Sequence, residues 1–278
     1  MGTGRKRGVG LALSSGSARG LAHIGVLKVL EKERIPIKAI AGSSMGALIG
    51  GLYAAGVPPT ELENIALKAT RRTVLTHIDL IPSLKGLVLG KKIEGMLRSF
   101  VGDKDFGELN IPMAIVATDI FTGEEVVFKD SGDLVDAIRA SISIPVVFVP
   151  VRIGDRTLVD GGIVNPVPVN VLPALDSDAV RVAVSVIPKI EHKQGEKPTP
   201  VGMFLNAFDI MQNRLYQANK PPATISIEPD VSFVSGLEFW EAKRLIECGE
   251  RATLEAIPEI KRKLKPFSFL SIFRKPRI

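Results

Sequence analysis

Residues 41–50 read AGSSMGALIG, a stretch in which two adjacent serines stand between glycines. Its centre fits the pattern Gly-x-Ser-x-Gly, in which Ser44 is the central serine. The apolar run IPIKAIAG precedes the pattern, and the small-residue segment SMGALIGGLYAAG follows it. A strand, a sharp turn and a helix in this order place the central hydroxyl at a helix N-terminus, where free N–H groups favour negative charge. Ser44 is therefore a candidate nucleophile; the alternative is that Ser43 or Ser44 only caps the helix.

The glycines of the pattern have a steric role. Gly42 and Gly46 lack a Cβ atom, so the strand and the helix can approach each other closely at the turn. The central residue of such a turn adopts a strained backbone conformation. We expect both glycines to be part of the motif, with Ser43 as a cap or a spacer.

On either side of residues 41–50, the chain alternates between strand and helix patterns. GVGLALSS is a short apolar run without helical periodicity, and GLAHIGVLKVLEKE has apolar residues at helical spacing. Alternation of this kind predicts an α/β fold of three layers, a mostly parallel central sheet with helices on both faces. Further strand candidates are MAIVATDI, EEVVFK, RTLVDGG and AVRVAVSVI, and further helix candidates span residues 134–141, 201–218 and 238–257.

The charge of the chain is concentrated at its end. The net charge is +6, and the last 22 residues hold seven Lys or Arg and one acid, so the other 256 residues are balanced. A balanced body argues against a nucleic-acid surface. The end interleaves bases with Phe267, Phe269 and Phe273, which suits an anionic membrane surface. The alternative is a solvated tail or a packed strand. We divide the chain into a domain of residues 1–265 and a basic, aromatic tail of residues 266–278.

The single cysteine, Cys248, excludes an intramolecular disulfide and favours a reducing compartment. The apolar part of GVGLALSSG is too short for a secretory signal, and no run approaches the roughly 18 apolar residues of a membrane span. The sequence therefore predicts a cytoplasmic protein with peripheral membrane contact. No Cys/His cluster has metal-ligand spacing, and we expect no metal or cofactor. A homo-oligomer is left open.

A serine nucleophile needs a base, and the chain has only three histidines. His23 lies in an apolar helix pattern, where a packed histidine is expected, and His77 has no partner motif. His192 follows in the order serine, acid, histidine of an α/β hydrolase, but its neighbours IEHKQGEKP form a polar loop. A triad through His192 is therefore the weaker of two routes.

The other route is Asp160. It lies at the end of a strand candidate in LVDGGIVNP, and Gly161 and Gly162 leave room for a close serine hydroxyl. An aspartate has a pKa of about 3.9 in water, so it must be desolvated to act as a base near neutrality. Apolar neighbours supply that environment here. The alternative is that Asp160 and Gly161 only form a β-turn.

Five segments together resemble the patatin-like phospholipase family, especially its small bacterial members and the catalytic domain of neuropathy target esterase. They are SSGSARGLAHIGVL, AGSSMGALIGGLYAAG, VATDIFTGEEVVF, AIRASISIPVVFVPV and LVDGGIVNPVPV, and the similarity runs from about Gly8 to Val169. The resemblance implies a patatin-like fold and a Ser-Asp dyad without histidine. Ser44 falls on the family's nucleophile, and Asp160 falls on the aspartate of its Asp-Gly-(Ala/Gly) motif.

The resemblance also implies an oxyanion hole in residues 15–20, SGSARG, which align with the family's Gly-Gly-Gly-x-Arg-Gly loop. The N–H groups of Gly16, Ser17 and Ala18 would hold the oxyanion, and Arg19 and Gly20 would brace the loop. Two family glycines are serines in this chain, and serine resists positive φ. A dinucleotide-binding loop is disfavoured because only Gly20 satisfies that pattern.

The family's activity implies hydrolysis of fatty acyl esters of phospholipids or lysophospholipids through an acyl-enzyme, with an acyl lipid as partner. Two alternatives stay open: an acyltransferase or thioesterase on the same dyad, and a weakly active lipid-binding regulatory protein. Residues 71–101 are interpreted as a cap or as a buried helical hairpin, and as a cap they would hold an acyl chain through Ile78, Leu80, Ile81, Leu84 and Leu87. Further positions are expected to shape the site without taking part in chemistry: Thr118, Asp119, Ser141, Ser143, Pro145, Phe148 and Asn165.

Overall fold

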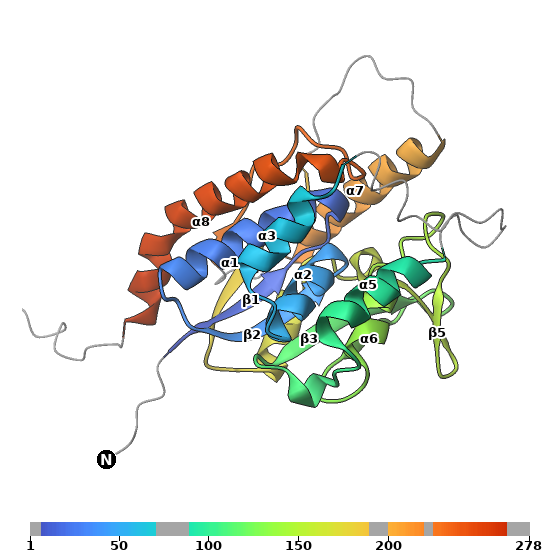
Figure 1. Ribbon diagram of the computed structural model, residues 1–278, viewed down its shortest axis with the longest axis horizontal. Coiled ribbons are helices and arrows are strands. Elements are labelled where there is room, and N and C mark those ends of the chain that lie inside the picture. The colour runs from blue at the N-terminus through green and yellow to red at the C-terminus, as the bar shows by residue number, and fades with distance from the viewer. Residues whose placement is uncertain (1–6, 71–88, 189–199, 220–224, 266–278) are drawn as a thin grey trace, which may run out of the picture.

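A mixed, mostly parallel sheet forms the centre of the computed structural model, which describes residues 7–70, 89–188, 200–219 and 225–265 (Figure 1). Within these residues the sheet has eight strands in the order β5-β6-β3-β2-β1-β7-β8, and β4 pairs with β3. The pairs β1–β2, β1–β7, β2–β3 and β7–β8 are parallel, whereas β3–β4, β3–β6 and β5–β6 are antiparallel. The strands are β1 (Val9–Leu13), β2 (Ile37–Ser43), β3 (Met113–Asp119), β4 (Glu125–Phe128), β5 (Val151–Ile153), β6 (Arg156–Asp160), β7 (Val180–Val184) and β8 (Ile225–Ile227).

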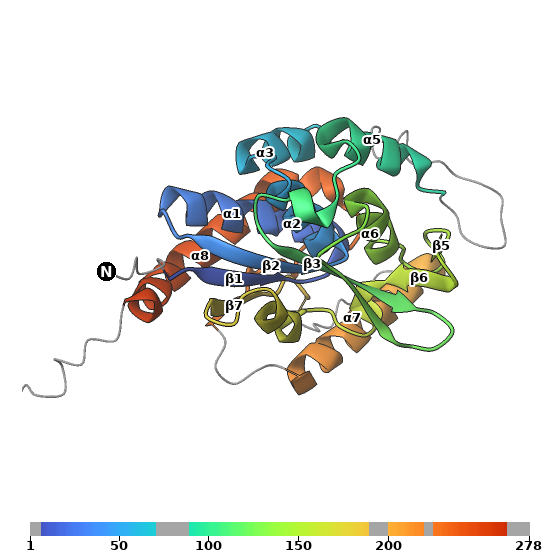
Figure 2. The same ribbon diagram turned by 90° about the horizontal axis from the view of Figure 1, so that it is seen from below.

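Helices cover both faces of this sheet, as Figure 2 shows. Most of them, including α1, α2 and α8, lie on one face, and α7 lies on the other with the segment that follows β6. The α-helices are α1 (Ala22–Lys32), α2 (Met45–Ala54), α3 (Pro59–Leu67), α5 (Lys91–Val101), α6 (Leu134–Ser141), α7 (Pro200–Asn219) and α8 (Ala242–Leu264). Short 3-10 helices are η1 (Ser17–Leu21), η2 (Phe106–Glu108), η3 (Gly161–Ile163), η4 (Val169–Ala174) and η5 (Phe239–Glu241).

The two faces of β1 differ in side-chain size, because alternate residues of a strand point to opposite sides. Leu11 and Leu13 are fully buried in the larger core, with residues of α1, α2 and α8. Ala12 is buried in the smaller core, together with other small residues of the sheet and Tyr216 of α7. The predicted three-layer α/β architecture is confirmed.

Several element boundaries differ from the sequence prediction. Strands β5 and β8 are only three residues long, and neither these strands nor helix α3 was predicted. Helix α8 begins at Ala242 and continues to Leu264, past Pro258, instead of spanning residues 238–257. The segment interpreted as a cap or hairpin spans residues 71–101. Residues 71–88, which include its five apolar side chains, lie outside the described residues, and the remainder contains helix α5.

The sheet register brings two distant loops together. Ser43 of β2 pairs with Val116, and Asp160 of β6 pairs with the next residue of β3, Ala117. β2 runs parallel to β3 and β6 runs antiparallel to it, so the two carboxyl ends approach from opposite directions. Ser44 and the turn after Asp160 therefore meet at one point of the sheet.

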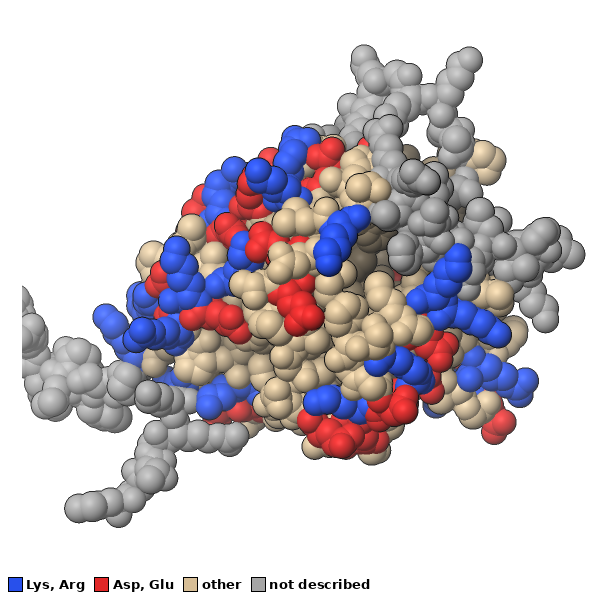
Figure 3. All heavy atoms as spheres, in the orientation of Figure 1, with Lys and Arg blue, Asp and Glu red and all other residues tan. Residues whose placement is uncertain are grey.

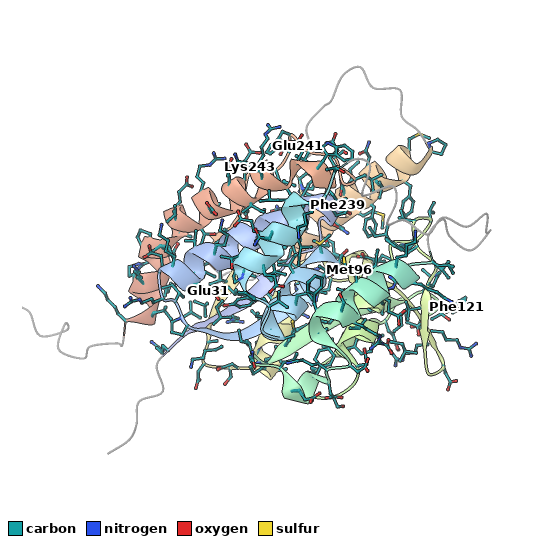
Figure 4. All side chains as sticks on the ribbon, in the orientation of Figure 1. Glu31, Met96, Phe121, Phe239, Glu241 and Lys243 are labelled. Carbon is teal, nitrogen blue, oxygen red and sulfur yellow. The ribbon has the colours of Figure 1, made fainter. Side chains whose placement is uncertain are left out.

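The surface bears basic and acidic side chains that are interspersed over the face seen in Figure 3. Phe121 projects from the turn between β3 and β4 and is 83% exposed (Figure 4). Among the described helices, none is both long enough and apolar enough to span a bilayer. The predicted tail, residues 266–278, lies outside the described residues.

Candidate active site

Ser44 occupies a sharp turn between β2 and α2. Its φ of 53° and ψ of −121° are unusual for a residue with a side chain, and such strain persists only where the surroundings enforce it. The N–H of Ser44 donates to the hydroxyl of Ser141 at 2.8 Å, and that hydroxyl donates to the carbonyl of Val116 at 2.6 Å. Ser141 thus ties the turn to β3, a contact that the sequence analysis did not predict.

The motif glycines permit the close contacts of this turn. A Cβ atom on Gly42 would lie 2.6 Å from the carbonyl oxygen of Gly46, and one on Gly46 would lie 2.1 Å from the carbonyl oxygen of Leu13. Both distances are far below van der Waals contact. The strand and the helix thus approach each other closely at both positions, as expected for glycine at these sites.

A helix-capping role for the serines is wrong. Ser44 stands at the N-cap of α2, but its side chain makes no capping hydrogen bond. The hydroxyl of Ser43 is buried and has no partner among the described residues, so Ser43 acts as a spacer. The Ser44 hydroxyl points elsewhere, toward Asp160.

Ser44 Oγ donates a hydrogen bond to Asp160 Oδ2 at 2.5 Å. The other carboxylate oxygen, Oδ1, accepts the N–H of Gly162 at 2.8 Å, so Asp160 both forms the predicted turn and contacts the serine. Asp160 is fully buried and Ser44 is 4% exposed. Burial raises the pKa of Asp160 to about 7, although the hydrogen bonds from Ser44 and Gly162 act in the opposite direction. Near neutral pH this carboxylate is therefore poised between its charged and neutral forms.

The backbone around Asp160 is fixed on both sides. Its N–H donates to the carbonyl of Ser143 at 2.9 Å, and its carbonyl accepts the hydroxyl of Thr118 at 2.8 Å. A Cβ atom on Gly161 would lie 2.2 Å from the carbonyl oxygen of Val116, so this position requires glycine for close approach. The carboxylate is held in place before any substrate arrives.

The predicted oxyanion loop lies against the N-terminus of α2. The N–H of Gly46 donates to the carbonyl of Ser14 at 3.1 Å, and a Cβ atom on Gly20 would lie 2.2 Å from Met45 Cγ. Ser17 adopts the positive φ that serine usually resists, at 50°, and Gly16 has a φ of 151°. The serine at position 17 is therefore compatible with the turn.

One predicted oxyanion donor is wrong. The N–H of Ala18 already donates to the carbonyl of Gly236 at 3.0 Å, so it is not available to a substrate in this conformation. Within the described residues, the N–H groups of Gly16 and Ser17 have no acceptor. These two groups remain as candidate donors.

Arg19 braces the loop from the side of the late chain. It is 5% exposed, its Nε donates to the carbonyl of Val234 at 2.9 Å, and its terminal nitrogens contact both carboxylate oxygens of Asp209, at 3.1 Å and 2.9 Å. Gln212, also on α7, accepts the hydroxyl of Ser15 at 2.7 Å. Neither α7 residue was predicted from the sequence; their spacing of three, which places them on one face of the helix, was the available signal.

The histidine route finds no support among the described residues. His23 is fully buried, its Nε2 lies 2.9 Å from the carbonyl oxygen of Ser14, and burial lowers the pKa of its ring to about 4, against the opposing effect of that hydrogen bond. His77 and His192 lie outside the described residues. No group of three metal-ligating side chains occurs in the described ranges.

The remaining predicted positions surround the dyad or lie beside it. The hydroxyl of Ser143 donates to the carbonyl of Arg139 at 2.7 Å, and the Arg139 guanidinium lies 5.4 Å from the ring centre of Phe148. The amide of Asn165 donates to Glu125 and Asn170 on the surface. A hollow of about 390 Å³ between α7 and residues 164–170 is lined by neither Ser44 nor Asp160. The hydrogen-bond geometry, and not this hollow, marks the site.

The patatin-like phospholipase family model matches residues 11–173. An NTE family protein of Mycobacterium tuberculosis is 43% identical over 178 residues, which cover 64% of this chain and 49% of the relative. A second one is 30% identical over 286 residues, which cover 92% of this chain and 48% of the relative. Lysophospholipase nte1 of Neurospora crassa is 28% identical over 250 residues, 87% of this chain and 16% of that protein. The chain thus spans about half the length of the mycobacterial relatives.

Solved structures show the same fold at low sequence identity. VipD from Legionella pneumophila aligns with a TM-score of 0.54 at 13% identity, over 91% of this chain and 67% of that one. The ExoU–SpcU complex of the Pseudomonas aeruginosa type III secretion system aligns with a TM-score of 0.50 at 16% identity, over 93% of this chain and 52% of that one. The family model covers more than half of the chain and includes both Ser44 and Asp160. The chain therefore belongs to the patatin-like phospholipase family.

Proposed function

We propose that the chain hydrolyses fatty acyl esters of phospholipids or lysophospholipids, with Ser44 as nucleophile and Asp160 as general base. The observation that carries the proposal is the 2.5 Å hydrogen bond from Ser44 Oγ to a fully buried carboxylate whose pKa is raised to about 7. A base whose pKa lies near the working pH is ionised to a substantial extent and still has enough proton affinity to accept the proton of the serine. Family membership and the similarity to a lysophospholipase support the choice of substrate.

In the proposed first step, Ser44 Oγ attacks the ester carbonyl carbon while its proton passes to Asp160 Oδ2. The carbonyl oxygen becomes negatively charged, and the N–H groups of Gly16 and Ser17 are the candidate donors to it. Asp160 then returns the proton to the leaving alcohol, which breaks the ester bond and leaves a fatty acyl ester on Ser44. Water then attacks this ester and gives a proton to Asp160, which passes it to Ser44 Oγ as the bond between the acyl carbon and Oγ breaks. Fatty acid is released, and both residues regain their starting forms.

The test is labelling by a fluorophosphonate, which reacts covalently with an activated serine. We expect label on Ser44 in the wild type, none in Ser44→Ala, and a loss of about 100-fold or more in the labelling rate of Asp160→Asn. Ser43→Ala is the matched control, because Ser43 is also buried and its hydroxyl makes no hydrogen bond to a described group. If the folded wild type takes no label, or if Ser43→Ala loses it, the proposed dyad is wrong.

Acyl transfer and a regulatory role are the competing proposals. An acyl-enzyme is intercepted by any acceptor that reaches it, so products formed with an added alcohol distinguish hydrolysis from transfer. A regulatory protein with a spoiled oxyanion loop is disfavoured by Ser17, which fits the turn with a φ of 50°. If the protein binds acyl lipids but hydrolyses them no faster than the uncatalysed background, the regulatory role is favoured over hydrolysis.

A further inference from the structure

Helix α7 carries three polar side chains on one face, and two of them, Asp209 and Gln212, contact the loop of residues 15–20. Asp209, Gln212 and Asn213 are spaced by three and four residues, so they share one face of the helix. Gln212 is 2% exposed, and a buried amide of this kind is expected to have a specific contact. Asp209 binds Arg19, whereas Asn213 donates to the carbonyl of Pro188 at 3.1 Å. Gln212 lies between these two contacts along the helix.

Ser15 is the partner of Gln212, and it joins two more parts of the site. Its hydroxyl donates to Gln212 Oε1 at 2.7 Å, and its N–H donates to the carbonyl of Pro166 at 2.9 Å. Ser15 is 1% exposed and immediately precedes Gly16. Gln212 helps to hold Ser15 in place through this hydrogen bond. Because Gly16 is the next residue, the position of its N–H depends on that contact.

Gly162 marks the point where the three segments converge. A Cβ atom built on Gly162 would lie 2.3 Å from Gln212 Nε2, 2.9 Å from Asp160 Oδ1 and 3.0 Å from Ser15 Cβ. The amide of Gln212, the carboxylate of Asp160 and the oxyanion loop thus enclose one α-carbon. Because these three groups pack around the same α-carbon, a change in the size or position of one of them displaces the other two.

We propose that Gln212 is a positioning residue that sets the distance between the oxyanion loop and the turn of Asp160, through its contacts with Ser15 and Gly162. The proposal rests on the proposed function of Ser44 and Asp160. The nucleophile and the oxyanion donors must match the transition state closely, and small displacements of such groups slow a reaction strongly. Gln212 acts on turnover without touching the substrate.

The first test compares Gln212→Met, which keeps the length of the side chain, with Asn213→Leu as the matched control on the same helix. With a soluble short-chain p-nitrophenyl ester, we expect Gln212→Met to lower kcat about 10- to 100-fold, less than the loss of an oxyanion donor, and to leave KM within about twofold. Asn213→Leu is expected to keep its kcat. Ser15→Ala should lower kcat to the same extent as Gln212→Met, because each substitution removes the same hydrogen bond between Ser15 and Gln212. For the same reason, the double variant should have a kcat no lower than that of either single variant.

The second test uses Gln212→Glu, which retains an acceptor for Ser15 but adds a carboxylate near Asp160. Burial and the hydrogen bonds from Ser44 and Gly162 determine the pKa of Asp160 in the wild type. A second negative charge disfavours its ionised form, so the rise of kcat/KM with pH should move to higher pH. Asn213→Asp, whose side chain turns to Pro188, should shift the profile less. A larger shift for Gln212→Glu than for Asn213→Asp would show that residue 212 lies beside Asp160, and the separate effects of Gln212→Met on kcat and KM test its positioning role.

The two proposals fail in different ways. Absence of Ser44-dependent labelling in the wild type refutes the proposed function. Normal labelling of the wild type, together with an undiminished kcat of Gln212→Met or a loss that adds fully to that of Ser15→Ala, refutes the positioning role alone. Circular dichroism and unfolding curves establish that each compared variant is folded.

Discussion

The carboxylate of Asp160 has opposite effects on activity and on stability. As the proposed base it must be ionised, and its pKa of about 7 makes that form available only as the pH rises. We expect kcat/KM to increase about tenfold per pH unit below pH 7 and to level off above about pH 8. A pH profile with a soluble ester measures this rise. A profile that stays flat from pH 5 to pH 8 contradicts the assignment of Asp160 as base.

The same pKa predicts a stabilising substitution. The folded state holds the proton of Asp160 up to about pH 7, whereas the unfolded chain releases it near its ordinary pKa. Folding stability contributed by this residue therefore falls as the pH rises from about 4 to about 7. Asp160→Asn removes the buried charge, so it should raise the free energy of unfolding more at pH 8 than at pH 5. Urea unfolding at the two pH values tests this, and equal effects contradict it.

Ser141 offers a third test at this scale. Ser141→Ala leaves the Ser44 N–H and the Val116 carbonyl without their common partner, and loss of such buried bonds costs about 1–3 kcal/mol. We expect lower stability of that order and a reduced kcat, because the strained turn loses its tie to β3. Ser143→Ala is the control, since its hydroxyl donates to the carbonyl of Arg139 in the last turn of α6 and not to the turn of Ser44. Equal losses of kcat in both variants would argue against a specific role of Ser141.

What the sequence reveals at the residue scale depends on whether the signal is local. Ser44 and Asp160 stand in short glycine-rich motifs, so the sequence alone makes both of them candidates. Ser141 and Gln212 act through contacts with residues 97 and 197 positions away, and no local pattern encodes such distances. Ala18 was misassigned for the same reason, because its acceptor, Gly236, belongs to the far end of the chain.

At the scale of elements, the contact between α1 and α8 depends on two glycines. A Cβ atom on Gly249 would lie 2.0 Å from the carbonyl oxygen of Ala22, and one on Gly25 would lie 2.1 Å from the carbonyl oxygen of Ile246. The helices therefore touch through their backbones. Gly249→Ala should destabilise the fold by about 1–3 kcal/mol, the usual cost of overpacking.

Gly95→Ala provides the matched control in helix α5. No atom lies within 4 Å of the Cβ that it would add, so only helix propensity changes, and stability should rise by about 0.5–1 kcal/mol. Thermal unfolding of both variants gives the comparison. Destabilisation of the two variants to the same extent would show that the close helix contact is not the cause.

Long elements with a clear apolar pattern were predicted from the sequence, whereas very short ones were not. Strands β1, β2, β3 and β7 are buried apolar runs of at least five residues, and each was identified. β5 and β8 have three residues each, too few for a periodic pattern, and they form only because neighbouring strands offer hydrogen bonds. The antiparallel pairing of β6 with β3, which brings Asp160 to Ser44, also has no signature in the sequence.

At the scale of the molecule, the question is how the protein reaches a lipid. Deletion of residues 266–278 removes three basic residues, Arg274, Lys275 and Arg277, and three phenylalanines. We expect weaker co-sedimentation with anionic vesicles and an unchanged rate with a soluble ester. Phe121→Ser is the control, because it removes an exposed aromatic side chain without changing the charge. Unchanged vesicle binding after the deletion would refute membrane contact by the tail.

The attachment of the oxyanion loop has a consequence for the order of synthesis. Ser44 and Asp160 are synthesised before Asp209, Gln212, Val234 and Gly236, and these four later residues hold the loop beside them. A ribosome-bound chain that ends before these residues contains both reacting groups and lacks the contacts that align them. Ester cleavage by the proposed dyad should therefore begin only after residues 209–236 have been synthesised and have folded against the loop. A nascent chain that lacks them should be inactive toward esters.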